Sequence, residues 1–322
     1  MKIAPQFVSA ACLVLAATLA QAQAWPTKPV RLVNPFPAGG GTDTFARPLA
    51  AKLGIALGQP IIVENMGGAG GTLGATSASK QAADGYTFFM GATHHAIAET
   101  LFPKLGYNIE RDFVPIAVVA VLPNVVVVNP KLPVKSVAEL IAYAKANPDK
   151  LNFGSAGNGT SHHLAGELFK SMTGTRLTHV PYRGAGPMMQ DLLGGNVDLA
   201  FDGMGSSAAQ IKSGKLRALA VTTLNRAAML PAVPTMSEAG VAGYEVTTWY
   251  AIWAIKGTPQ PVIDRMQKEI AIALASPDIK AIWEQQGATT GPASPVEFAP
   301  FLKSEIARWG KVVREGNVKV DL

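Results

Sequence analysis

The chain has 322 residues, of which 48% are hydrophobic and 16% are charged, and its formal net charge is +6. A chain of this length is larger than one hydrophobic core usually serves, so we expect two domains. Its basic residues are scattered instead of clustered, which argues against a nucleic-acid-binding protein, whereas the mild positive charge favours anionic ligands.

Residues 1–24 have the features of a cleaved signal peptide. Lys2 gives a short positive segment, an apolar run of signal length follows, and the small residues of AQA allow cleavage after Ala22 or Ala24. The alternative is an uncleaved N-terminal anchor. No later segment reaches the roughly 18 apolar residues of a membrane-spanning helix. Cys12 is the only cysteine, so the mature chain can form no disulfide. We therefore expect a soluble protein exported to the bacterial periplasm.

The next part of the chain alternates β-rich runs with helical stretches. Strands are expected at 30–36, 60–65 and 86–92, and helices at 42–58 and 67–81. This order is typical of a parallel sheet with helices on both faces. Thr42 or Asp43 is expected to cap the first helix, with Pro48 near its first turn.

The rest of the chain predicts a second α/β unit and a return to the first. Residues 113–130 read as buried strands or as strands that cross between lobes, and Ser136 and Glu139 form a capping box for the helix that follows. Strands and helices then alternate over 151–223. A β-rich segment at 243–257 could carry the chain back. Three helices follow at 259–276, 277–287 and 294–316 and are expected to pack on the first lobe. The expected division is 25–122 with 250–322 for lobe 1, and 123–249 for lobe 2.

The first Gly-rich turn, PFPAGGGTD, is a candidate anion-binding site. It does not match the dinucleotide pattern G-x-G-x-x-G, because Thr44 stands where the last glycine is required. Its backbone N–H groups and the N-terminus of the following helix can still hold an anion. We expect Gly39, Gly40 and Gly41 to let a carboxylate approach the backbone, the alternative being a loop that serves only tight packing. Another Gly-rich turn, at 67–71, either lines the same site or serves close packing.

The second Gly-rich turn, GSAGNGTSHH, has glycines at P-loop spacing but has Thr160 where that motif requires lysine. Ser155, Asn158, Thr160 and Ser161 supply short hydrogen-bonding side chains around free amides. That chemistry suits a carboxylate better than a triphosphate. The alternative for Thr160 or Ser161 is simple capping of the next helix.

No catalytic set or metal site stands out in the sequence. His94–His95 and His162–His163 are adjacent pairs, whose members point about 100° apart on a helix. We expect one member of each pair to face the cleft as a hydrogen-bond donor and the other to be structural. A metal site would need His94 and His162 brought together with a carboxylate. A periplasmic hydrolase or isomerase that uses Asp202 with His94 or His162 is the alternative to a binding protein.

Six motifs together resemble the Bug-type solute receptors of tripartite tricarboxylate transporters. In chain order they are PFPAGGGTDTFAR, VENMGGAGGTLGA, ADGYTFFMG, FGSAGNGTSHHLAGELF, VPYRGAGPMMQDLLGGNVDLAFD and PTMSEAG. The resemblance implies an α/β, type II-like periplasmic binding protein whose two lobes close like a flytrap about a hinge of two crossing segments. It implies a receptor without catalytic residues, cofactor or metal.

The resemblance also implies where the ligand binds. In the family, the turn after the first strand and the turn that opens the second-lobe helix grip one carboxylate, and two further loops complete the pocket. Carried over to this sequence, the expected ligand-binding residues are Phe36, Pro37, Ala38, Gly39, Gly40, Gly41, Thr42, Asp43, Thr93, His94, Ser155, Asn158, Gly159, Thr160, Ser161, His162 and Asp202.

Two departures from the family pattern leave the ligand's identity open. Met66–Gly67 stands where the family often has Arg-Pro, and the segment GATHHAIAE is rich in histidine. The expected ligand is a small organic mono- or dicarboxylate, aromatic or aliphatic. The expected partners are the membrane subunits of a tripartite-type transporter, with a sensor that feeds a signalling partner as the alternative. We expect a monomer that binds no nucleic acid.

Overall fold

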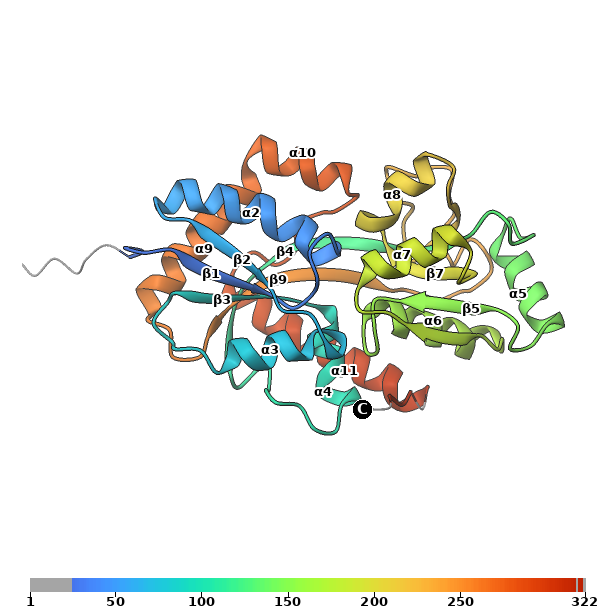
Figure 1. Cartoon of the computed structure of the whole chain (residues 1–322), viewed down its shortest axis with the longest axis horizontal. Coiled ribbons are helices and arrows are strands. Elements are labelled where there is room, and N and C mark those ends of the chain that lie inside the picture. Colours follow the sequence, from blue (N-terminus) through green and yellow to red (C-terminus); the bar gives the residue numbers. More distant parts are fainter. Residues whose placement is uncertain (1–24, 317, 321–322) are drawn as a thin grey trace, which may run out of the picture.

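The computed structural model describes residues 25–316 and 318–320, so the expected signal peptide lies outside the described residues. The described chain forms a nine-stranded mixed sheet flanked by helices, arranged as two lobes (Figure 1). Eight strands follow the order β2, β1, β3, β9, β4, β7, β5 and β6, and β8 pairs with β4. The strands are β1 Val30–Asn34, β2 Ile61–Asn65, β3 Thr87–Ala92, β4 Phe113–Val128, β5 Asn152–Ser155, β6 Thr178–Pro181, β7 Leu199–Gly203, β8 Arg217–Val221 and β9 Thr247–Ile255.

Each lobe contains a parallel part of the sheet, and two antiparallel strands join the parts. β1 pairs in parallel with β2 and β3, and β5 pairs in parallel with β6 and β7. Residues 113–123 of β4 pair with β9, whereas residues 124–128 pair with β7 and β8. The unbroken apolar run of β4 suits a strand that is covered on both faces. One long strand therefore crosses between the lobes, and β9 returns beside it.

Helices cover both faces of the sheet. The longer helices are α2 Gly41–Leu57, α3 Thr72–Ser79, α4 Thr93–Leu101, α5 Val137–Ala146, α6 Ser161–Thr173, α7 Ala185–Gly194, α8 Met204–Lys212, α9 Gln260–Ala275, α10 Pro277–Gln285 and α11 Pro295–Glu315. Ser136 caps α5 as predicted, since its side chain accepts a hydrogen bond from the Glu139 N–H. α9 and α10 pack near α2, as expected for the first lobe, but α11 contacts α6 of the other lobe as well as α4.

The prediction for the start of α2 was wrong in two respects. The N-cap is Gly40, with no side-chain cap, so neither Thr42 nor Asp43 caps the helix. Pro48 lies in the helix interior, where it cannot donate a backbone hydrogen bond to the preceding turn and costs about 3 kcal/mol. Burial of the neighbouring apolar face, which includes Phe45 and Leu49, offsets that cost.

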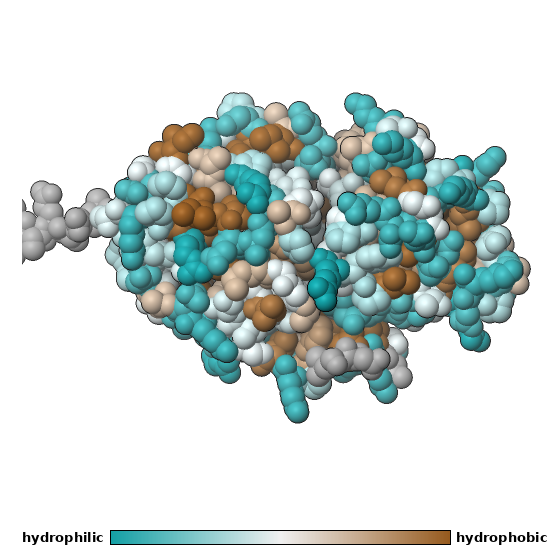
Figure 2. Space-filling view, viewed as in Figure 1, coloured by the Kyte–Doolittle hydropathy of each residue, from teal (hydrophilic) through white to brown (hydrophobic). Residues whose placement is uncertain are grey.

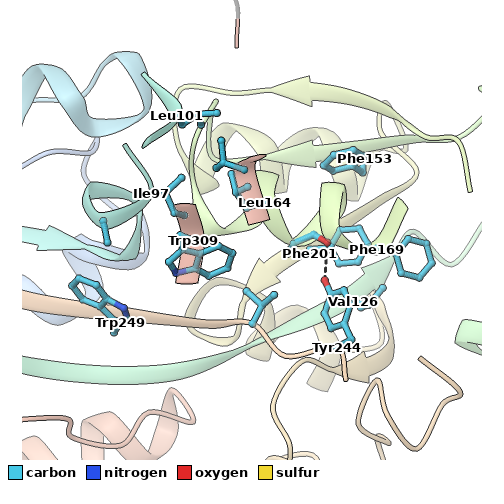
Figure 3. Packing of buried hydrophobic residues seen from close by; sticks show 14 of the residues in the cluster. Ile97, Leu101, Val126, Phe153, Leu164, Phe169, Phe201, Tyr244, Trp249 and Trp309 are labelled. Carbon is cyan, nitrogen blue, oxygen red and sulfur yellow. Dashed lines mark hydrogen bonds between the residues drawn. The ribbon is translucent and has the colours of Figure 1, made fainter. Parts of the chain in front are cut away.

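A continuous hydrophobic core joins the two lobes on one face of the sheet. Figure 3 shows Ile97 and Leu101 of α4, Leu164 of α6, Trp249 of β9 and Trp309 of α11 packed around one region. Helices from both lobes thus share this core.

Most of the surface in Figure 2 is polar, and its hydrophobic residues lie in separate groups. The large exposed hydrophobic residues are Ile55, Ile62, Leu73, Met172, Leu224, Ile272 and Val296. Within residues 25–316 and 318–320, none of the helices has the length and apolar character needed to cross a membrane.

Candidate functional site

A cavity lies between the lobes, at the ends of the strands from which the Gly-rich turns start. The residues that line it are Phe36, Pro37, Ala38, Gly40, Gly41, Thr42, His94, Ala156, Thr160, Ser161, His162, Gly184, Ala185, Gly186, Pro187, Thr248 and Tyr250.

The cavity brings together many of the residues predicted from the sequence but not all of them. Those that line it are Phe36, Pro37, Ala38, Gly40, Gly41, Thr42, His94, Thr160, Ser161 and His162. The predicted residues outside its lining are Gly39, Asp43, Thr93, Ser155, Asn158, Gly159 and Asp202. Asn158 instead lines a neighbouring cleft, opposite the turn at 67–71.

Asp43 and Gly39 shape the first turn from behind the cavity. The Asp43 carboxylate is buried and accepts hydrogen bonds from Gly39 N–H at 2.9 Å, Arg47 Nε at 2.7 Å and Asn65 Nδ2 at 3.0 Å. Burial alone would raise the pKa of Asp43, but these hydrogen bonds lower it below its ordinary value. Gly39 has a φ of +78°, a left-handed conformation that favours glycine. Gly39 thus holds the shape of the turn and does not line the cavity.

Side chains of the second turn are also used internally. The Ser155 hydroxyl lies 2.6 Å from His179 Nε2 and accepts a hydrogen bond from the Gly157 N–H. The Thr160 side chain caps α6 by accepting from the His163 N–H. Thr160 thus has the capping role that was the alternative prediction, although it also lines the cavity.

The first turns of four helices surround the cavity. Gly41 and Thr42 begin α2, His94 lies in the first turn of α4, Ser161 begins α6 and Ala185 begins α7. The N-terminus of a helix carries a partial positive charge and free N–H groups. Within the described residues, no lysine, arginine, aspartate or glutamate lines this cavity. Its positive character therefore comes from backbone dipoles, and it suits a small anion.

Two histidines, His94 and His162, line the cavity, one from each lobe. Burial lowers the pKa of His94 well below its ordinary value, and the nearby His95 and His162 add to this effect. Burial also lowers the pKa of His162, although the Asp202 carboxylate opposes it. Both rings are therefore neutral near pH 7, and each can offer one donor and one acceptor nitrogen.

The second histidine of each pair has a structural role, as the sequence analysis expected. His95 Nδ1 accepts a hydrogen bond from the Ala92 N–H at 2.9 Å, and His163 Nδ1 accepts one from the Gly159 N–H at 3.2 Å. Each ring thus satisfies a backbone N–H at the start of its own helix. Neither His95 nor His163 lines the cavity.

Asp202, an expected ligand-binding residue, lies behind the cavity wall and does not line the cavity. It is fully buried at the end of β7, and its Oδ2 accepts hydrogen bonds from Ser206 and Ser207 at 2.6 Å each. Its Oδ1 lies 3.3 Å from His162 Nδ1. Thr93 is also buried behind the wall, where its hydroxyl accepts a hydrogen bond from the Trp249 N–H.

Sequence reasoning missed the contributions of β9 and α7. Thr248 and Tyr250 of β9 line the cavity, as do residues 184–187 at the start of α7. Tyr250 and Thr248 alternate with buried core residues along an apolar strand, so nothing local distinguishes them. Gly184, a glycine directly before a helix, could have indicated the contribution of α7, because the first and second Gly-rich turns also place glycine before a helix. No group of three or more potential metal-ligating side chains occurs in the part of the chain that the structure describes.

Comparisons with known proteins give one consistent result. Residues 45–318 match the family model described as tripartite tricarboxylate transporter family receptor. Protein BugT of Bordetella pertussis is 40% identical over 301 residues, which cover 93% of this chain and 92% of BugT. The structure of R. palustris Rpa4515 with adipate is 40% identical with a TM-score of 0.89, over 92% of this chain and 99% of that one. The periplasmic binding protein BugD is 38% identical with a TM-score of 0.88, again over 92% and 99%. The matched family is thus one of receptors and not of enzymes, and BugD is described as a periplasmic binding protein.

Proposed function

Because the chain belongs to the receptor family of tripartite tricarboxylate transporters, we propose that it captures a small organic carboxylate between its lobes and delivers it to the membrane subunits of such a transporter. The observation that carries this proposal is the convergence of four helix N-termini on one cavity whose lining has no lysine or arginine among the described residues. Adipate in the related Rpa4515 structure supports a carboxylate as the ligand class.

The proposed binding mode uses neutral donors. The carboxylate is held by backbone N–H groups at Gly41 and Thr42 from one lobe and at Ala185 from the other. Hydrogen bonds to an anion are roughly twice as strong as neutral ones, so a few such donors suffice without an ion pair. The binding residues are the predicted ones that line the cavity, together with Thr248 and Tyr250.

The proposed motion is a rigid rotation of one lobe against the other. We assign residues 25–122 and 250–322 to the first lobe and 123–249 to the second, because β4 and β9 join the two parallel parts of the sheet there. In this arrangement each lobe contributes two of the helix N-termini. Binding therefore requires closure, and release requires opening.

The proposed location is the periplasm, reached through a signal peptide at 1–24. The related BugD is described as a periplasmic binding protein, and the composition of the first residues has the pattern of an export signal. We propose that the receptor works as a monomer. Its partners would be membrane subunits of the tripartite type.

The test is to identify what the protein carries. Freshly purified protein is denatured, and the released small molecules are identified by mass spectrometry. The compounds found, and a panel of mono- and dicarboxylates, are then titrated by calorimetry. We expect binding of at least one carboxylate without chemical change. Turnover of a bound carboxylate, or binding of cationic or neutral solutes alone, contradicts the proposal.

A further inference from the structure

Two buried polar atoms lie close to each other behind the cavity wall. Asp202 Oδ1 and His162 Nδ1 are 3.3 Å apart, and neither makes a hydrogen bond within the described residues. The other carboxylate oxygen of Asp202 is already held by the hydroxyls of Ser206 and Ser207. Since buried polar groups in native proteins are nearly always hydrogen-bonded, we infer that each of these atoms is the other's partner, because only 3.3 Å separates them.

This pairing fixes the position of the proton on the imidazole of His162. A carboxylate only accepts hydrogen bonds, so His162 Nδ1 must carry the hydrogen. In a neutral imidazole the other nitrogen, Nε2, then has a lone pair. His162 lines the cavity while its Nδ1 is buried, which leaves Nε2 as the ring nitrogen that a ligand can reach.

We propose that Asp202 is a positioning residue that holds the proton of His162 on Nδ1, so that Nε2 accepts a hydrogen bond from the ligand and selects carboxylates that carry a hydroxyl group. This inference rests on the proposed function and adds to it a feature of the ligand. The carboxylate itself is repelled by the Nε2 lone pair and lies toward the N-termini of α2 and α7. The hydroxyl then lies on the side of the cavity where α6 begins.

A hydroxyl fits this acceptor better than an ammonium group does. Four helix N-termini point at the cavity, so its potential is positive and disfavours a cation. The cavity lining contains no carboxylate that could neutralise an ammonium group, within the residues that the structure describes. A neutral O–H donor needs no such partner, because it can be satisfied by one nitrogen lone pair.

Replacing Asp202 by asparagine should move the proton to the other nitrogen. Ser206 and Ser207 both donate to one oxygen of Asp202, and Ser206 also contacts the Gly203 carbonyl. The oxygen of the new amide therefore stays on the serines, and its NH₂ group faces His162. Nδ1 becomes the acceptor, and Nε2 enters the cavity as a donor.

The closing experiment has one measurement without ligand and one with ligand. Nitrogen-15 NMR of the ligand-free protein identifies which ring nitrogen of His162 carries the proton. Calorimetry then compares butanoate with its 2-, 3- and 4-hydroxy derivatives, with 2-aminobutanoate, and succinate with malate. Asp191→Asn is the control, because that aspartate accepts hydrogen bonds from Tyr182 and Asn196 away from the cavity.

For the wild type we expect a proton on Nδ1 and about tenfold tighter binding of at least one hydroxylated acid than of its unsubstituted counterpart. Asp202→Asn should lose this preference and carry the proton on Nε2, whereas Asp191→Asn should retain both properties. A proton on Nε2 in the wild type, or equal affinity for hydroxylated and unsubstituted acids, overturns the inference. If no carboxylate binds the wild type, the proposed function fails instead, and the NMR spectrum still decides the tautomer.

Discussion

Substitution of Gly41 by alanine should weaken the binding of every carboxylate ligand. A Cβ at this position would lie 2.4 Å from the hydroxyl oxygen of Tyr250 and 3.4 Å from its Cζ. Gly41 has no left-handed φ, so the penalty comes from this contact and not from the backbone. Tyr250 must therefore shift, and because it lines the cavity, its movement changes the space that the ligand uses. Overpacking of this kind costs about 1–3 kcal/mol, which corresponds to roughly 5- to 150-fold in affinity.

The neighbouring Gly40 offers a matched control. It also lines the cavity, but a Cβ there would meet only the Pro37 carbonyl oxygen, at 3.4 Å. Calorimetry with the identified ligand should therefore give nearly wild-type affinity for Gly40→Ala and reduced affinity for Gly41→Ala. In a Tyr250→Phe background the clash with the hydroxyl is absent, so Gly41→Ala should cost much less. The reasoning is refuted if Gly41→Ala binds like the wild type, or if Tyr250→Phe gives no relief.

Three further predictions follow from the contacts between and within the lobes. Gly70→Ala would place a Cβ 2.1 Å from the Asn158 backbone oxygen of the other lobe, so the lobes should close less completely and calorimetry should show weaker binding of all ligands. The control is Gly214→Ala, because Gly214 is also left-handed but its Cβ would meet nothing within 4 Å. Thr160→Ala removes the cap of α6 and should lower stability by about 1 kcal/mol, seen as a lower melting temperature that Thr160→Ser largely restores. Burial lowers the pKa of His163 to about 4, below the ~6.5 of the unfolded chain; the unfolded state therefore takes up the proton first, and stability should fall as the pH decreases from about 6.5 to 4. A urea midpoint that is constant over that range would contradict this last prediction.

The sequence was informative where a feature depends on neighbouring residues. The strands before the Gly-rich turns, the helices after them and the capping of α5 by Ser136 follow from local patterns. The same holds for the position of one histidine of each pair at the cavity, since adjacent residues on a helix cannot face one direction. The first and second Gly-rich turns line the cavity because each one precedes a helix whose N-terminus faces the cavity.

The sequence was less informative where a role depends on residues far along the chain. Asp43 looked like a ligand or a cap, but its partners include Asn65, 22 positions away. Asp202 looked like a cleft residue, but the buried side chain faces His162 from behind. Tyr250 belongs to an apolar strand, and only the packing of α2 beside β9 brings its hydroxyl to Gly41. In each case the partner is set by tertiary packing, which a local pattern does not contain.

The arrangement of the helices also couples affinity to closure. α2 and α4 belong to the half built on β1 and β3, whereas α6 and α7 belong to the half built on β5 and β7. Each N-terminus contributes about half a positive charge, and its effect falls off within about one helical turn. When the lobes separate, an anion can remain near two N-termini but not near all four. A fixed arginine would keep its full charge beside the ligand in both states. The proposed site, whose positive potential comes from backbone dipoles, therefore loses much of its attraction for the anion on opening, and this is the property that a receptor needs if it is to release its ligand.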